Sequence, residues 1–128
     1  MQEGYVSDRS SLLSSSEHFR KVEFACNHCG ELHPDGVNKE LVALLEELRS
    51  HFNSPVSINS GYRCPVHNSN VGGAKNSQHL QGKAADVVVK GHTPAEVHAW
   101  ADKANPNGGV GKYNTFTHID VRTGKARW

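Results

Sequence analysis

The sequence predicts an α+β fold, in which a small and mostly antiparallel sheet is flanked by helices and carries a long functional loop. Three observations support this fold class. The elements follow one another as helix, strand, loop, strand, helix, strand, strand, and no internal repeat interrupts them. The two helical segments are amphipathic. The strands are short and separated by turn-forming residues, as in an α+β domain of one sheet.

Two segments have helical periodicity. In residues 38–52 the apolar side chains fall at i, i+3, i+4, i+7 and i+11 and form one stripe of Leu41, Leu44, Leu45, Leu48 and Phe52. The second helix begins at the capping box of residues 93–96, which has proline at the first helical position. Its stripe is Val97, Trp100, Ala101 and Ala104, and the run of residues 105–108 (NPNG) ends it.

Four segments are predicted strands. Residues 56–59 (VSIN) alternate, and residues 84–89 (AADVVV) form an apolar run that indicates burial on both sides, except at Asp86. The segments GGVGKY and THIDVR are joined by a tight connection near Asn114. Between the first two strands lies a Gly-, Asn- and Ser-rich loop with one short helical turn expected after Pro65. Loops of about 20 residues without regular structure are uncommon in compact domains and are usually functional.

We expect one domain over residues 18–128, after a flexible, Ser-rich lead-in of residues 1–17.

Composition excludes several classes of partner. The net charge is +1, from 14 basic and 13 acidic residues, which argues against nucleic acid. No apolar stretch approaches the roughly 20 residues of a spanning helix, so we expect no membrane insertion. The N-terminus lacks the features of a signal peptide, so we expect a protein made in the cytoplasm, and a monomer.

The last predicted strand has two chemically different faces. His118, Asp120 and Arg122 alternate with Ile119 and Val121. The apolar pair should face the core, so we expect His118 and Asp120 to face a cleft or solvent.

Together with His79 and Asp86, this strand suggests a metal site. Two imidazoles, a carboxylate and one water are the arrangement of a catalytic zinc ion, and a cation would compensate the buried charge of Asp86. The spacing alone leaves another interpretation open, in which His79 is a loop histidine, Asp86 a hydrogen-bonded carboxylate and His118 a surface residue.

The cysteines form a second pattern. Cys26 and Cys29 make a CxxC, and Cys64 and His67 make a CxxH, which together are the ligand set of a structural zinc site. Three cysteines cannot all pair within one chain. A disulfide between Cys64 and one member of the CxxC, with one free thiol, and three reduced cysteines are the alternatives.

From about Phe24 to the end of the chain, the segments INSGYR, VGGAKNSQHLQGKAADV and HID resemble the M15 family of zinc D-alanyl-D-alanine peptidases, especially its phage and bacterial cell-wall branch. The resemblance implies a hedgehog/DD-peptidase-like fold and one catalytic zinc ion bound by His79, Asp86 and His118. It also implies that Arg63 receives the terminal carboxylate of the substrate, as a bidentate guanidinium can. We expect Ser77 and Tyr62 to contact substrate as well.

The activity that the resemblance implies is zinc-dependent hydrolysis of peptide bonds in peptidoglycan stem peptides, by a D,D-carboxypeptidase or by an endopeptidase of the endolysin type. Such an enzyme would reach the cell wall by a phage-type or prophage-type release route. Several family members carry an acidic base three residues before the last zinc histidine, where this chain has Thr115.

Asp120 is the best remaining carboxylate, either as the base or as the residue that holds a zinc histidine in its tautomer. A non-catalytic, zinc-containing wall-binding or phage structural module on the same fold is the alternative function. A small interaction domain stabilised by metal is a third.

Overall fold

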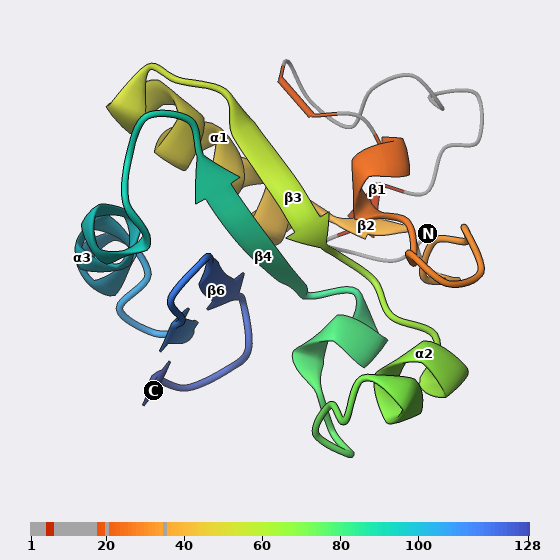
Figure 1. Cartoon of the computed structure of the whole chain (residues 1–128). Helices are drawn as coiled ribbons and strands as arrows, with labels where there is room; N and C mark the ends of the chain where they lie inside the picture. The colour runs from red at the N-terminus through yellow and green to blue at the C-terminus, as the bar shows by residue number, and fades with distance from the viewer. Residues whose placement is uncertain (1–4, 7–17, 20, 35) are drawn as a thin grey trace.

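The computed structural model describes residues 5–6, 18–19, 21–34 and 36–128. Its main sheet has five strands in the order β3-β4-β6-β5-β7 (Figure 1). These strands are β3 (Val56–Ser60), β4 (Ala84–Val89), β6 (Thr117–Asp120), β5 (Gly109–Lys112) and β7 (Ala126–Arg127). A separate antiparallel pair joins β1 (Tyr5–Val6) to β2 (Val37–Asn38). The predicted lead-in of residues 1–17 lies outside the described residues, apart from β1.

The fold is α+β, as predicted, and its main sheet is mixed. The pairs β3–β4, β4–β6 and β5–β6 are antiparallel, whereas β7 pairs with β5 in parallel. The sequence did not indicate β7, because a strand of two residues has too few positions to display a periodicity.

Helix α1 (Lys39–Phe52) forms where the sequence predicts it. The side chain of Asn38 accepts a hydrogen bond from the Leu41 amide and caps the first turn, while Asn53 ends the helix in the left-handed region at φ 47°. The predicted leucine stripe is buried, and α1 passes behind β3 and β4 (Figure 1).

One face of the sheet forms the core. The register places Val56 opposite Val89, and Ile58 opposite Val87, so these side chains share a face. Helix α3 (Pro94–Ala104), with the predicted capping box, packs against β4, β5 and β6 on this face. Thr117 of β6 fixes that packing, because its hydroxyl donates to the Pro94 carbonyl at 3.1 Å.

The opposite face carries the polar residues. Asp86 of β4 lies opposite Ser60 of β3 on one side and opposite His118 of β6 on the other. His118 in turn lies opposite Gly111 of β5, and Asp120 lies opposite Gly109. On the face that looks away from α1 and α3, two glycines of β5 therefore lie beside the two polar residues of β6.

The long loop between β3 and β4 contains two short helices. These are α2 (Pro65–Asn70), which was predicted, and the 3-10 helix η3 (Gln78–Gln81), which was not. Both lie beyond the same end of the two strands (Figure 1). A further 3-10 helix, η2 (Lys21–Phe24), precedes the CxxC segment.

Replacing Leu45 by alanine tests this account of the core. Leu45 is 0% exposed and belongs to the apolar cluster between α1 and the sheet. We expect Leu45→Ala to lower the free energy of unfolding by about 2–5 kcal/mol, because the substitution leaves a cavity. Urea unfolding followed by circular dichroism measures the change. The exposed Glu47→Ala, on the same helix, is the control and should stay within about 0.5 kcal/mol.

Candidate active site

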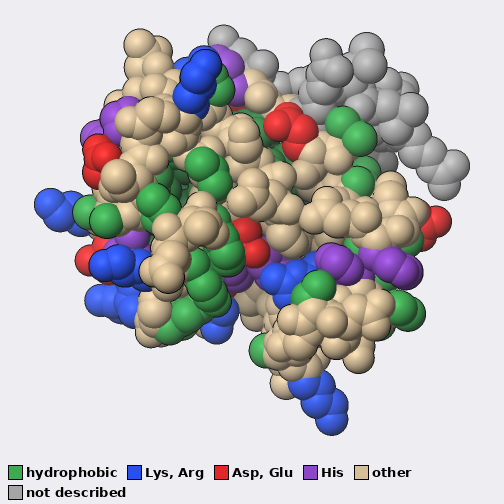
Figure 2. All heavy atoms as spheres, viewed as in Figure 1, with side chains coloured by type: hydrophobic (Ala, Val, Ile, Leu, Met, Phe, Trp, Pro, Cys, Tyr) green, Lys and Arg blue, Asp and Glu red, His purple; other side chains and the backbone are tan. Residues whose placement is uncertain are grey.

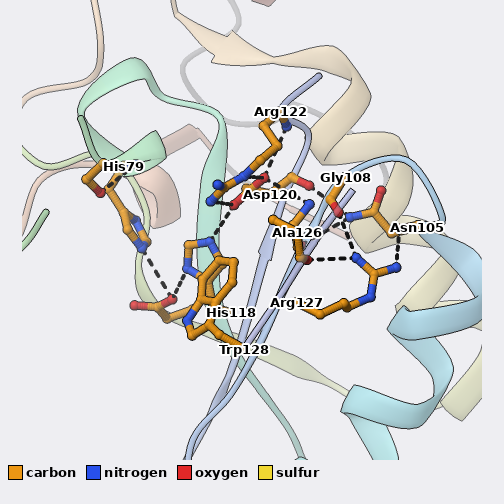
Figure 3. A network of polar contacts seen from close by, with 12 residues as sticks. His79, Asn105, Gly108, His118, Asp120, Arg122, Ala126, Arg127 and Trp128 are labelled. Carbon is orange, nitrogen blue, oxygen red and sulfur yellow. Dashed lines mark hydrogen bonds and ion pairs between the residues drawn. The ribbon is translucent and has the colours of Figure 1, made fainter. Parts of the chain in front are cut away.

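Three buried side chains converge on one point. His79, Asp86 and His118 each offer a ligand atom within 4.8 Å of the other two. The Oδ1 of Asp86 lies 3.3 Å from Nε2 of His79 and 3.0 Å from Nδ1 of His118. Figure 3 shows both imidazoles pointing at this carboxylate. The structure therefore brings together the three residues that the sequence predicts as metal ligands.

Local structure explains how each ligand reaches this point. Asp86 and His118 are partners across β4 and β6. His79 comes from η3, where the hydroxyl of Ser77 accepts a hydrogen bond from the His79 amide and caps the turn. Gly82 ends η3 with φ +69°, a conformation that favours glycine, and a Cβ there would also meet the side chain of His33 at 2.9 Å.

The outer hydrogen bonds of the two histidines set their tautomers. His79 Nδ1 lies 2.6 Å from the carbonyl oxygen of Gly61, which can only accept, so Nδ1 carries the proton. His118 Nε2 lies 2.7 Å from the carboxylate Oδ2 of Asp120 and is protonated for the same reason. In the neutral rings, the lone pairs of His79 Nε2 and His118 Nδ1 thus both face Asp86. Two lone pairs and a carboxylate aimed at one point fit a divalent cation such as zinc.

The electrostatics of Asp86 agree with a charged carboxylate. Burial by itself would raise its pKa, but the protonated forms of His118 and His79 would each donate to this carboxylate, and their effect outweighs burial and lowers the pKa to about 2. For His118, burial favours the neutral ring, whereas the neighbouring carboxylates of Asp120 and Asp86 raise the pKa overall.

Asp120 is fully buried beneath the site. Its carboxylate accepts hydrogen bonds from the Gly109 amide at 3.1 Å and from the Arg122 amide at 3.1 Å, in addition to its contact with His118. The guanidinium of Arg122 adds two more, at 2.9 and 2.7 Å. Burial opposes the charge of Asp120, but these donors hold its pKa well below the usual range.

The expectation that Asp120 faces a cleft or solvent was therefore wrong. Arg122 and the backbone of β5 cover the carboxylate, and its exposed fraction is 0%. The two roles considered for Asp120 need different surroundings. A general base has to reach the attacking water. Holding the tautomer of His118 needs only the 2.7 Å contact that is present.

A cavity of about 540 Å³ opens over the three candidate ligands. Figure 2 shows histidine, acidic and basic side chains together at the surface near the middle of the molecule. The predicted site residues that line the cavity are Arg63, Ser77, His79, Asp86 and His118. Tyr62 is not among its lining residues; its ring instead lies edge-on to His33, with 5.6 Å between centroids.

Arg63 is held at the edge of the cavity. Its Nη1 donates to Oδ1 of Asn68 at 3.0 Å, and its Nη2 lies 3.7 Å from Oδ2 of Asp86. Gly73 leaves room for this pair, since a Cβ there would meet Asn68 Oδ1 at 2.1 Å and Arg63 Nη1 at 2.6 Å. The guanidinium is therefore positioned from two sides and lies beside the candidate metal ligands.

Sequence reasoning missed most of an aromatic wall. Tyr113, Phe116 and Trp128 line the cavity. The Tyr113 and Phe116 rings stack at 4.4 Å, and the Trp128 indole donates to the Tyr113 hydroxyl at 2.9 Å. Trp128 also lies 4.9 Å from the ring of His118.

Trp128 reaches the cavity because β7 pairs with β5, and Arg127 anchors β7. Its guanidinium donates to the carbonyls of Gly108, Asn105 and Ala126 (Figure 3). The Trp128 carbonyl also accepts from the Lys112 amide at 2.8 Å. Nothing in the local sequence signals this placement.

The three cysteine thiols also lie together. Cys26, Cys29 and Cys64 are free, and their sulfur atoms are within 4.8 Å of one another. His67, predicted as the fourth ligand, is outside this group of three, whereas Nδ1 of His28 lies 3.8 Å from the Cys64 sulfur.

The donor set and the cavity define a class of protein. A buried His-Asp-His set that opens into a cavity is typical of metal-dependent hydrolases, which keep one coordination position for water or substrate. The family model described as Peptidase M15 matches residues 14–120. The chain belongs to the M15 peptidase family.

Two curated relatives match part of the chain. It is 35% identical over 71 residues to the zinc D-Ala-D-Ala carboxypeptidase of Streptomyces albus G, a match that covers 51% of this chain and 27% of that protein. It is 38% identical over 80 residues to a Haemophilus influenzae protein named "Probable peptidoglycan L,D-endopeptidase MepK", covering 59% of this chain and 42% of the relative. The matched regions thus span less than half of either relative. Among the described residues, no helix is long and apolar enough to cross a membrane.

Proposed function

We propose that this chain is a zinc-dependent peptidase that hydrolyses peptide bonds in peptidoglycan stem peptides, as a D,D-carboxypeptidase or an endopeptidase. One observation carries the proposal: the lone pairs of His79 and His118 and the carboxylate of Asp86 meet at the wall of a cavity. Membership of the M15 family and the printed activities of the two relatives support it. We also propose that the protein acts at the cell wall, as a monomer that arrives by a phage-type release route.

In this proposal His79, Asp86 and His118 bind one zinc ion, and the remaining residues position the reactants. When bound, zinc lowers the pKa of its water toward ~7 and polarises a carbonyl. Asp120 keeps the proton of His118 on Nε2, so that Nδ1 stays available as a ligand. Arg63 presents its guanidinium to the terminal carboxylate of the stem peptide, and Ser77 shapes the turn that delivers His79. The aromatic wall of Tyr113, Phe116 and Trp128 faces the substrate from the other side.

The question of which residue acts as the general base favours a second candidate function. Thr115 occupies the position of the usual acid, and among the described residues that line the cavity Asp86 is the sole carboxylate. This observation supports a zinc-containing module that binds the wall without cleaving it.

Purified peptidoglycan separates the two functions. The zinc-loaded protein is incubated with cell walls, alone and with a chelator, the walls are then digested with a muramidase, and the soluble products are analysed by mass spectrometry. A peptidase gives free D-alanine or muropeptides with shortened or uncrosslinked stems, and the chelator prevents this change. The masses also identify the bond, because D,D- and L,D-cleavage leave different stems. Binding to the wall without any change in these products would contradict the peptidase proposal and favour the module.

Replacing Arg63 tests its role in binding the terminal carboxylate. Hydrogen bonds to charged groups contribute about 1.5–3 kcal/mol, so we expect Arg63→Ala to raise KM roughly 10- to 100-fold for a stem peptide with a free carboxyl end. Steady-state kinetics with this peptide and with its C-terminal amide measure the effect. The amide should bind wild type and variant about equally. An equal loss with both peptides would instead indicate that Arg63 only supports the loop through Asn68.

A further inference from the structure

We propose that Cys26, Cys29 and Cys64 form a second, structural zinc site, completed by one imidazole of the neighbouring pair His28 and His67. This site goes beyond the proposed peptidase function, because the catalytic residues lie elsewhere and the thiols do not line the cavity. Three thiolates and one imidazole are a closed tetrahedral ligand set, which is typical of zinc that stabilises a fold.

The geometry of the two segments supports this assignment. The CxxC segment turns sharply, because the Gly30 amide donates to the Cys26 carbonyl at 2.8 Å and Gly30 has φ +76°. The Cys64 amide donates to the Cys26 sulfur at 3.3 Å, and the His67 amide donates to the Cys64 sulfur at 3.4 Å. Amide donors that point at sulfur stabilise the thiolate form, which is the form that binds metal.

Two imidazoles lie beside the three thiols. Nδ1 of His28 is 3.8 Å from the Cys64 sulfur. The His67 ring is nearly parallel to that of His28, with 6.0 Å between centroids and 10° between planes. In this proposal one imidazole of the pair closes the tetrahedron.

The site would fasten the N-terminal segment to the loop that serves the active site. The Tyr62 amide donates to the Phe24 carbonyl at 2.8 Å, and a Cβ on Gly61 would meet the Phe24 backbone at 2.7 Å, so the two segments are in close contact. The Gly61 carbonyl accepts from His79, and the Arg63 amide donates to the His79 carbonyl at 3.1 Å. A metal ion at Cys64 therefore fixes the end of the segment that orients His79.

Metal content and cobalt spectra of the full chain test the proposal. We expect two zinc ions per chain for protein prepared under reducing conditions. Replacement by cobalt(II) should give thiolate-to-cobalt charge-transfer absorption in the near ultraviolet, which a site made of histidine and carboxylate lacks. One zinc per chain together with no thiolate band would overturn the proposal. So would three thiols that react with Ellman's reagent in the native zinc-loaded protein, or a disulfide found by mass spectrometry.

Variants assign the ligands. Cys64→Ser is the most informative, since Cys64 is the N-cap of α2 and serine is a favourable N-cap, so the fold should survive. We expect this variant to lose one zinc ion and the thiolate band. Asp86→Asn is the matched control and should lose the other zinc ion while the band remains. A thiolate band that persists unchanged in Cys64→Ser would overturn the assignment of that ligand.

Histidine variants identify the fourth ligand. Loss of the cobalt band, or a shift of its energy, in His28→Ala or in His67→Ala identifies that histidine. No change in either single variant or in the double variant would overturn the imidazole part of the proposal. These readouts do not depend on hydrolysis, so an inactive protein that keeps the thiolate band would contradict the proposed peptidase function and leave the structural site intact.

Discussion

Replacing any one of His79, Asp86 or His118 is expected to abolish peptidoglycan hydrolysis. These residues supply the converging ligand atoms, and each is at most 6% exposed. A bound metal ion contributes several kcal/mol to transition-state stabilisation, which corresponds to a loss of at least about a thousandfold in kcat. The amount of cleaved stem peptide and the zinc content of His79→Ala, Asp86→Asn and His118→Ala measure the effect.

Two controls make this result specific. His98→Ala removes an imidazole from α3 and should leave both hydrolysis and zinc content at the wild-type level. Treating the wild type with a chelator and then restoring zinc should remove and recover activity, because the folded chain holds the ligand side chains in place. Full hydrolysis by a metal-free variant would contradict the role that we assign to these residues.

Replacing Asp120 by asparagine is expected to weaken zinc binding and hydrolysis together. The carboxylate holds the proton on Nε2 of His118 and also receives the guanidinium of Arg122. An asparagine is neutral and cannot satisfy the same donors. Loss of a residue that positions a metal ligand typically costs about 10- to 100-fold in metal affinity or activity, and we expect a decrease of this size in both. Zinc titration with a competing chelator and kinetics at saturating zinc measure the two losses separately.

The outcome for Asp120→Asn distinguishes two roles. If excess zinc restores most of the activity, Asp120 acts by positioning His118. A large loss of kcat with unchanged zinc affinity would instead show that Asp120 is the base. Asp102→Asn is a suitable comparison, because Asp102 also accepts from an arginine, Arg127, but lies on α3 outside the cavity. It should change neither quantity.

The elements that carry local signals could be predicted from the sequence. The leucine stripe of α1, the capping box of α3 and the apolar run of β4 each give a pattern within about ten residues, and the structure places all three where the patterns indicate. The alternation in β6 also separated Ile119, which faces the core, from His118, which faces the site.

Features that depend on distant contacts could not be predicted. Alternation assigns Asp120 to a face but does not say what covers that face, and here Arg122 and the backbone of Gly109 do so. Trp128 reaches the cavity through a parallel pairing with β5, which has no local signature. The position of His28 depends on how the CxxC segment turns toward Cys64, which sequence spacing does not define.

The two glycines of β5 limit which amino-acid substitutions this site can tolerate. A Cβ at Gly109 would meet the Asp120 carboxylate at 2.3 Å, and one at Gly111 would meet the Trp128 ring at 2.6 Å. In a library that randomises every position around the cavity, Gly109 and Gly111 should therefore accept almost no substitution. Altered substrate preference would have to be selected through the loop between α2 and η3 and through Tyr113 and Phe116, which follow β5.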